Sequence, residues 1–104
     1  MKFKIHYAKI GALYNTEGWY HRMRVRKQEL GTRNIAGGRV EQRRKAIGMK
    51  QKDLLTQLQV RGIDLNASGL SKLEGQLRSI NDYELVALAD VLGVTINWLV
   101  GQED

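Results

Sequence analysis

A run of small and polar side chains in the middle of the chain holds the groups best suited to contact another molecule. The run consists of Ala67, Ser68, Gly69, Ser71 and Lys72. None of these side chains is bulky near the start of the expected helix, so the backbone of a helix in this region can come close to the base edges of a nucleic acid. Leu70 and Leu73 are spaced to point the other way and to anchor such a helix to a core.

Other kinds of chemistry lack the residues that they need. The chain has no cysteine, and its two histidines, His6 and His21, cannot form a metal site alone. The sequence contains no glycine-rich phosphate loop after a strand, no serine–histidine–aspartate set and no paired carboxylates in an apolar setting. We therefore expect no catalytic residue, no metal and no cofactor, and a protein that is not an enzyme.

Glycines predict where the helices around the polar run end. Five of them each follow a stretch that is compatible with a helix: Gly48, Gly62, Gly75, Gly93 and Gly101. Glycine is favoured just past a helix end because it adopts the left-handed conformation without a Cβ clash. These positions predict five short helices between residues 34 and 101.

Capping residues mark the starts of three of these helices. Asn81 followed by Glu84 predicts a capping box. Thr95 is placed to cap the last helix, and either Asn66 or Ser68 is placed to cap the helix that carries the polar run.

The apolar spacing agrees with five helices in one bundle. Leu54, Leu55 and Leu58 share one helix face, and Val40, Ile47 and Met49 give the first helix a thinner one. The widest stripe consists of Leu85, Val86, Leu88, Ala89, Val91 and Leu92. That helix should be central and mostly buried. Helices of this size cannot bury their stripes alone, so the fold class is all-α, a compact bundle of five helices.

Two of the predicted helices form a recognisable pair. The helix that begins at Gln51 is joined to the helix of the polar run by a connection that contains Gly62. Two short helices joined in this way form a helix-turn-helix, whose second helix lies in the major groove of DNA while the first crosses the DNA backbone.

The charge is distributed unevenly along the chain. Seventeen basic residues against eleven acidic ones give a net charge of +6 and a pI near 9.8. Residues 1–33 hold eight basic and two acidic residues, whereas residues 82–104 hold five acidic residues and no basic one. The basic part suits a polyanion, with the acidic part turned away; two solvated faces are the alternative. Arg43, Arg44 and Lys45 are either a phosphate-binding stripe or solubility charges.

Residues 1–33 form a basic N-terminal extension ahead of the helical domain at residues 34–104. Three interpretations stay open. Residues 2–7 and 19–26 alternate polar and apolar side chains, which predicts a β-hairpin that must pack on the bundle or on a second subunit. The segment is otherwise a basic arm, or it precedes a true start at Met23 or later.

The ordered motifs of residues 35–101 resemble the phage-repressor-and-Cro-like helix-turn-helix family, often called the XRE family. The segment 48–51, GMKQ, looks like the family's "G-L-T-Q" entry to the second helix. Residues 70–75, LSKLEG, look like its "I-S-x-I-E-x-G" motif, and residues 84–101, ELVALADVLGVTINWLVG, resemble its C-terminal "L-x-x-L-A-x-A-L-G-V-x-x-x-W-L" motif. The resemblance covers about two thirds of the chain and implies a repressor-like DNA-binding domain.

The resemblance also implies a set of binding residues. The DNA-binding set is Gln51, Asn66, Ala67, Ser68, Gly69, Ser71, Lys72, Arg78 and Ser79. Within it, Gln51 bonds a phosphate or a base edge, and Arg78 and Ser79 contact phosphate. Glu74 matches a structural position whose carboxylate ties the helix to backbone or to an arginine. The last helix lies at a dimer seam, with Ile96, Trp98 and Val100 as the contacts.

This chain departs from the family pattern between its two central helices. Gln51 and Glu74 lie farther apart than is common in the family, so the extra residues fall around Val60–Leu65. Ile63 and Leu65 should point inward and Asp64 outward. Gly69 lies inside a helix, where it costs about 1 kcal/mol against alanine; close approach to DNA and tolerance of a weak helix are the two explanations.

We expect a cytoplasmic, sequence-specific, double-stranded-DNA-binding transcriptional regulator. Repression would follow because two recognition helices of a homodimer occlude a promoter. One alternative is an antitoxin-type autoregulator that binds a protein partner through residues 1–33. Another is a protein-interaction module that keeps the fold without binding DNA. No predicted segment spans a membrane.

Overall fold

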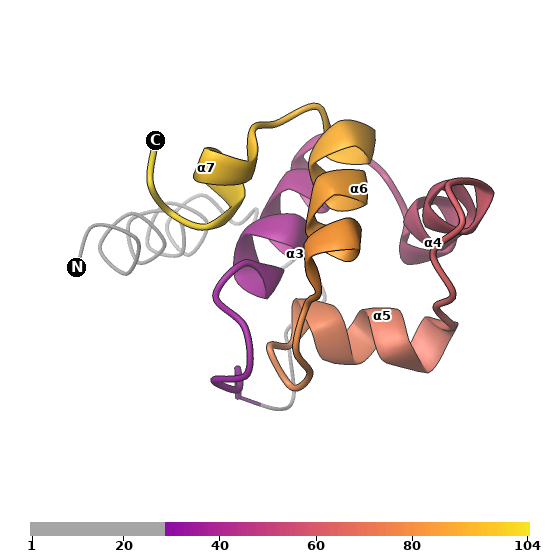
Figure 1. Cartoon of the computed structure of the whole chain (residues 1–104), viewed down its shortest axis with the longest axis horizontal. Coiled ribbons are helices and arrows are strands. Elements are labelled where there is room, and N and C mark those ends of the chain that lie inside the picture. Colours follow the sequence, from indigo (N-terminus) through magenta and orange to yellow (C-terminus); the bar gives the residue numbers. More distant parts are fainter. Residues whose placement is uncertain (1–28) are drawn as a thin grey trace, which may run out of the picture.

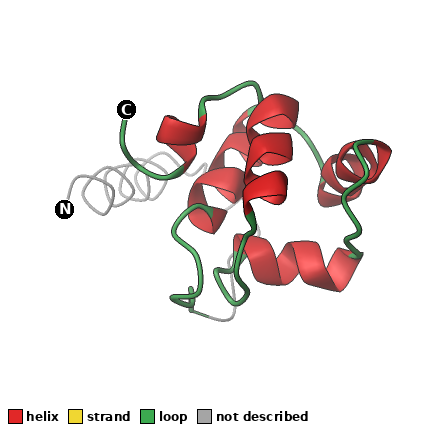
Figure 2. Ribbon diagram, in the orientation of Figure 1, coloured by secondary structure: helices red, strands yellow, loops and turns green. Residues whose placement is uncertain are grey.

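The protein is described by a computed structural model in which residues 29–104 are placed. These residues form five α-helices and no strand (Figure 2). The predicted hairpin and the start at Met23 fall in residues 1–28, which lie outside the described residues; of the alternative basic arm, residues 1–33, only residues 29–33 are described. Within residues 29–104, no helix is both long enough and apolar enough to cross a membrane.

The five helices follow the predicted order (Figure 1). They are α3 (Gly37–Ala46), α4 (Gln51–Val60), α5 (Ala67–Glu74), α6 (Asp82–Leu92) and α7 (Ile96–Leu99). The all-helical architecture predicted from the glycine spacing is thereby confirmed. The predicted domain boundary between residues 33 and 34 stays a prediction.

The predicted capping residues of the last three helices are confirmed. Asn66, not Ser68, caps α5, because its side-chain oxygen accepts a hydrogen bond from the backbone nitrogen of Gly69. Asn81 and Glu84 form the capping box of α6. Thr95 accepts from the backbone nitrogen of Trp98 at the start of α7. These side chains satisfy backbone N–H groups that the first turn of a helix leaves without intrahelical partners.

Four of the five predicted glycines have the expected left-handed conformation, and Gly75 does not. Gly48, Gly62, Gly93 and Gly101 have positive φ angles. Gly75 has φ −79°, and the following residue, Gln76, takes the left-handed conformation at φ 60°. The prediction for Gly75 is therefore wrong by one residue. The chain upstream of α3 bonds to Gly75 and Gln76 and holds this turn.

One core joins the helices. Its fully buried leucines come from four of them and are Leu54, Leu58, Leu70, Leu73, Leu88, Leu92 and Leu99. Helix α6 packs against α3, α4 and α7, in the central position predicted for it. The predicted stripe of α6 was too wide, since Val86 is 56% exposed. Val86 lies on the outer side of α6 with Tyr83, whereas Leu88 and Leu92 face the core. Ile47, predicted on the apolar face of α3, follows that helix and is exposed.

Helix α3 starts directly against the end of α5. A Cβ atom on Gly37 would lie 2.1 Å from the backbone oxygen of Leu73 and 3.0 Å from that of Glu74. Only glycine therefore allows the two helices to approach this closely, and a larger residue must force the backbones apart.

We predict that Gly37→Ala lowers the free energy of unfolding by about 3 kcal/mol. The new methyl group clashes with a backbone carbonyl, which cannot move aside by changing a side-chain rotamer. Urea unfolding measures the loss. Gly48→Ala is the matched control: its φ is +72° and nothing lies within 4 Å, so only backbone strain of about 1 kcal/mol is expected. An equal or smaller loss for Gly37→Ala would contradict the close contact.

Candidate nucleic-acid interface

Helices α4 and α5 pack against each other and are joined by residues 61–66. Leu65 is buried, Ile63 is half-buried and Asp64 is exposed, as predicted. The backbone nitrogen of Ile63 donates to Leu58 O at 3.0 Å, and the side chain of Gln59 donates to Leu65 O at 3.0 Å. These bonds fix the longer connection, so that α5 has a defined orientation relative to α4.

The polar run lies on one exposed face of α5. Ala67, Ser68, Ser71 and Lys72 are exposed, and Gly69 is half-buried. Ser68 and Lys72 are four residues apart, one turn from each other on the same face. Leu70 and Leu73 are buried on the opposite side, as their spacing predicted. The structure thus brings most of the predicted base-reading residues together.

Gly69 has an explanation inside the fold. A Cβ atom at this position would lie 2.7 Å from a methyl carbon of the buried Leu65 and 3.1 Å from the capping oxygen of Asn66. The glycine leaves room for the turn and for the cap. Both explanations offered from the sequence, close approach to DNA and a tolerated weak helix, overlooked this contact because it depends on how the connection folds back on α5.

Glu74 at the end of α5 holds three helices together. Its carboxylate accepts two hydrogen bonds from Arg44 of α3, Nε to Oε2 at 2.6 Å and Nη2 to Oε1 at 3.0 Å. Both side chains are buried. Arg44 also donates to Met49 O at 3.0 Å, and Gln51 of α4 donates to Glu74 Oε1 at 2.8 Å. The prediction that Glu74 is tied to an arginine is confirmed.

The contacts of Glu74 change the interpretation of Arg44 and of Gln51. The phosphate-stripe interpretation is wrong for Arg44, because burial against Glu74 removes its guanidinium from the surface. The residues on either side of Arg44 also have partners. Arg43 Nε donates to Leu92 O at 2.9 Å, and Lys45 Nζ lies 3.4 Å from Glu41 Oε2. Gln51 is half-buried, and the hydrogen bond that it donates to Glu74 orients its side chain.

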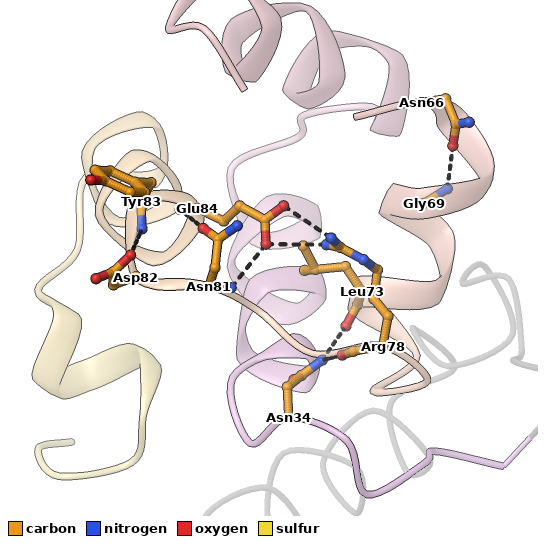
Figure 3. A network of polar contacts seen from close by, with 9 residues as sticks. All are labelled: Asn34, Asn66, Gly69, Leu73, Arg78, Asn81, Asp82, Tyr83 and Glu84. Atoms are coloured by element: carbon orange, nitrogen blue, oxygen red, sulfur yellow. Dashed lines mark hydrogen bonds and ion pairs between the residues drawn. The ribbon is translucent and has the colours of Figure 1, made fainter. Parts of the chain in front are cut away.

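The loop after α5 carries Arg78 and Ser79. Ser79 is exposed. Arg78 forms a two-pronged ion pair with Glu84 of α6, with Nη1 to Oε1 at 3.3 Å and Nη2 to Oε2 at 3.0 Å (Figure 3). The same carboxylate accepts from the backbone nitrogen of Asn81 at 3.0 Å. The sequence did not predict this partner, and it fixes the direction of the Arg78 side chain, which is still 31% exposed.

Sequence reasoning also missed Asn34 and two lysines. Asn34 bonds to the end of α5, to the loop after it and to the start of α3. The tendency of an asparagine side chain to accept from the backbone two residues on, as Asn34 does from Ala36, was an available signal. Lys50 and Lys52 are exposed on either side of Gln51, at the start of α4. Lys50 lies in the "G-L-T-Q"-like segment 48–51 and Lys52 directly follows it, which was the available signal.

The proposed dimer contacts lie on α7 and, for Val100, directly after it; α7 packs on α3 and α6 and lies away from α5 (Figure 1). Ile96 is 39% exposed, and Trp98 and Val100 are half-buried. The guanidinium of Arg39 lies 4.7 Å from the centre of the Trp98 ring and donates to Trp98 O at 2.7 Å. Desolvation by burial lowers the pKa of Arg39, and the charge of Asp104 acts in the opposite direction. One face of the tryptophan is thus occupied within the chain.

The comparisons with known proteins add no relative. No protein-family model matches the chain, and neither the curated proteins nor the solved structures include a match to it. Among residues 29–104, no group of three or more histidine, cysteine, aspartate or glutamate residues is placed to hold a metal ion. The functional conclusion therefore rests on the side chains of α4, α5 and the loop after α5.

We predict that Arg44→Met and Glu74→Met each lower the free energy of unfolding by about 3–5 kcal/mol, because each leaves the other partner buried without its counter-charge. The double variant Arg44→Met/Glu74→Met should lose clearly less than the sum of the two. Urea unfolding of all four proteins closes the double-mutant cycle. Additive losses would show that the two side chains do not stabilise each other.

Proposed function

We propose that this chain is a sequence-specific, double-stranded-DNA-binding transcriptional regulator with a repressor-like helix-turn-helix domain. The observation that carries the proposal is the outer face of α5, which combines exposed small and polar residues with a buried opposite side. A helix with these properties can approach the base edges of a major groove while the core keeps it in place.

The proposed contacts divide into two kinds. Ser68, Ser71 and Lys72 offer hydroxyl and ammonium groups to base edges from the exposed face of α5. Gln51 at the start of α4, and Arg78 and Ser79 in the loop after α5, are assigned to the sugar–phosphate backbone or to a base edge. The exposed Lys50 and Lys52 beside Gln51 add positive charge at the start of α4. Contacts to phosphate orient a protein on DNA, and contacts to bases give it specificity.

The network around Glu74 supports recognition by a preformed surface. Arg44 and Gln51 bond to this one carboxylate from the two other helices. Helix α5 is therefore fixed relative to α4 before any partner binds. A surface that is already ordered loses less conformational entropy on binding, which favours affinity.

Repression by promoter occlusion completes the proposal. In a homodimer, two recognition helices would enter successive major grooves about 34 Å apart and exclude polymerase. We assign the dimer contacts to Ile96 and Trp98 of α7 and to Val100, which follows it. These residues are partly exposed, and α7 lies away from α5 (Figure 1). A dimer formed there leaves the face of α5 uncovered in both copies.

Selection from a pool of random DNA duplexes tests the function directly. Wild-type protein should enrich one sequence motif, and binding to the selected duplex should weaken steeply with salt because lysine and arginine displace counterions from phosphates. A protein-interaction module that has lost DNA binding would enrich no motif and would show no salt-dependent binding to any duplex. That result would overturn the proposal.

We predict that Ser68→Ala and Lys72→Ala reduce discrimination between the selected duplex and an unrelated one. Each base contact contributes about 1–3 kcal/mol of discrimination, so the ratio of affinities should fall by roughly tenfold or more. Competitive binding with both duplexes measures this ratio. Lys45→Ala, which removes the same charge from α3, is the control and should leave the ratio unchanged. Wild-type ratios for both Ser68→Ala and Lys72→Ala would place the recognition face elsewhere.

We predict that Arg78→Ala weakens binding to the selected and the unrelated duplex alike and lowers the salt slope by about one, because a phosphate contact carries no sequence information. Titrations at several salt concentrations measure the slope. Arg61→Ala is the matched control, since Arg61 also pairs with a carboxylate of α6, Asp90, at 2.8 Å. It should leave the slope unchanged. Equal slopes for Arg78→Ala and wild type would remove Arg78 from the interface.

A further inference from the structure

The end of α5 is held by a segment that lies far upstream in the chain. We name residues 29–35, which precede α3, the strap. The strap bonds to residues 73–78, which comprise the last turn of α5 and the loop after it (Figure 3). None of the residues assigned to DNA binding belongs to the strap, yet the strap touches the segment that carries Arg78.

The side chain of Asn34 makes four hydrogen bonds to backbone groups. Its Nδ2 donates to Leu73 O at 3.0 Å and to Arg78 O at 2.8 Å. Its Oδ1 accepts from the backbone nitrogens of Ala36 at 3.1 Å and Gly37 at 2.7 Å. The two ends of the amide therefore have separate tasks: the oxygen caps the start of α3, and the nitrogen holds the end of α5 and the loop together.

Backbone contacts complete this arrangement. Gly31 N donates to Gly75 O at 2.8 Å, and Arg33 N donates to Gln76 O at 3.0 Å. The side chain of Gln76, whose φ is 60°, donates to Asn34 O at 2.6 Å. A left-handed conformation is unfavourable for a residue with a Cβ atom, so these bonds keep the turn in a shape that it would not adopt by itself.

The fit between the strap and the turn leaves no spare room. A Cβ atom on Gly31 would lie 2.3 Å from the backbone oxygen of Gln76 and 2.8 Å from a methyl carbon of Leu77. Any side chain at position 31 must therefore displace the strap from the turn. This position offers a second way to loosen the same contact, independent of Asn34.

We propose that Asn34 is a positioning residue for DNA binding. Through its two donated hydrogen bonds it sets the distance and direction between the face of α5 and the Arg78–Ser79 loop, so that base contacts and phosphate contacts are made at the same time. This inference rests on the proposed function. Asn34 does not itself touch DNA; it acts through the carbonyl groups of Leu73 and Arg78.

The separate tasks of the amide allow a clean test. At pH 8, Asn34→Asp keeps an oxygen that can cap α3 but has no hydrogen to donate to Leu73 O and Arg78 O. Affinities are measured for two probes, the duplex that wild type selects from a random pool and an unrelated duplex of the same length. We expect the ratio of the two affinities to fall by roughly tenfold, the equivalent of about one hydrogen bond.

Two further variants distinguish positioning from a loss of stability. Val91→Ala truncates a half-buried side chain of α6 that packs against the core, and none of the hydrogen bonds described for the strap involves Val91; the variant should lower the melting temperature and leave the affinity ratio unchanged. Gly31→Ala should lower the ratio in the same direction as Asn34→Asp. Because it keeps Asn34, Gly31→Ala tests the inference even where Asn34→Asp does not fold.

Each result decides one of the two proposals. A wild-type ratio in both Asn34→Asp and Gly31→Ala overturns the inference while the proposed function stands. Equal losses of affinity for the two duplexes, as expected from a smaller folded fraction, also overturn it. Wild-type protein that binds neither duplex overturns the proposed function, and the inference falls with it.

Discussion

The buried ion pair between Arg44 and Glu74 is the contact on which the rest of the structure depends. It joins the first described helix to the last turn of α5 at 2.6 Å, and Gln51 brings the start of α4 to the same carboxylate. Removing two charges from water is costly, and the cost is offset only when the geometry is good and the remaining hydrogen-bonding groups have partners. Here Arg44 has a third acceptor in Met49 O. The main effect of the pair is therefore to fix how three helices are arranged, rather than to add to the free energy of unfolding.

That arrangement explains how a weak helix can present a defined surface. Helix α5 has eight residues, including Gly69, and a helix this short is marginal alone in water. Asn66 caps its start, Leu70 and Leu73 anchor its inner side, and Glu74 holds its end. Leu70, Leu73 and Glu74 are buried, away from the exposed face proposed to meet DNA. Ser68, Ser71 and Lys72 are exposed and remain available for the proposed binding, and the contacts that hold the helix are made by other side chains.

The sequence predicted what depends on neighbours along the chain. The caps at Asn66, Asn81 and Thr95 and the glycine ends of four helices are local signals, and the structure confirms them. The errors concern contacts between distant segments. The left-handed residue moved from Gly75 to Gln76 because the strap bonds to that turn from 42 positions away. Val86 was assigned to the core because periodicity gives the width of an apolar stripe but not how much of it the neighbouring helices cover.

Two cations, whose internal partners the sequence did not identify, show the same limit at the candidate site. Arg44 and Arg78 look alike in a list of basic residues, yet one is buried against Glu74 and the other pairs with Glu84 at the edge of α6. Composition counts charge, whereas binding depends on which charges remain exposed after internal pairing. For Arg78, the partner is also useful to the proposed role. The carboxylate of Glu84 orients a long, flexible side chain in advance, this side chain is 31% exposed, and its guanidinium has N–H donors that Glu84 does not use. An arginine held in this way loses little further freedom when it meets a phosphate, so an internal ion pair and a DNA contact at the same residue are compatible.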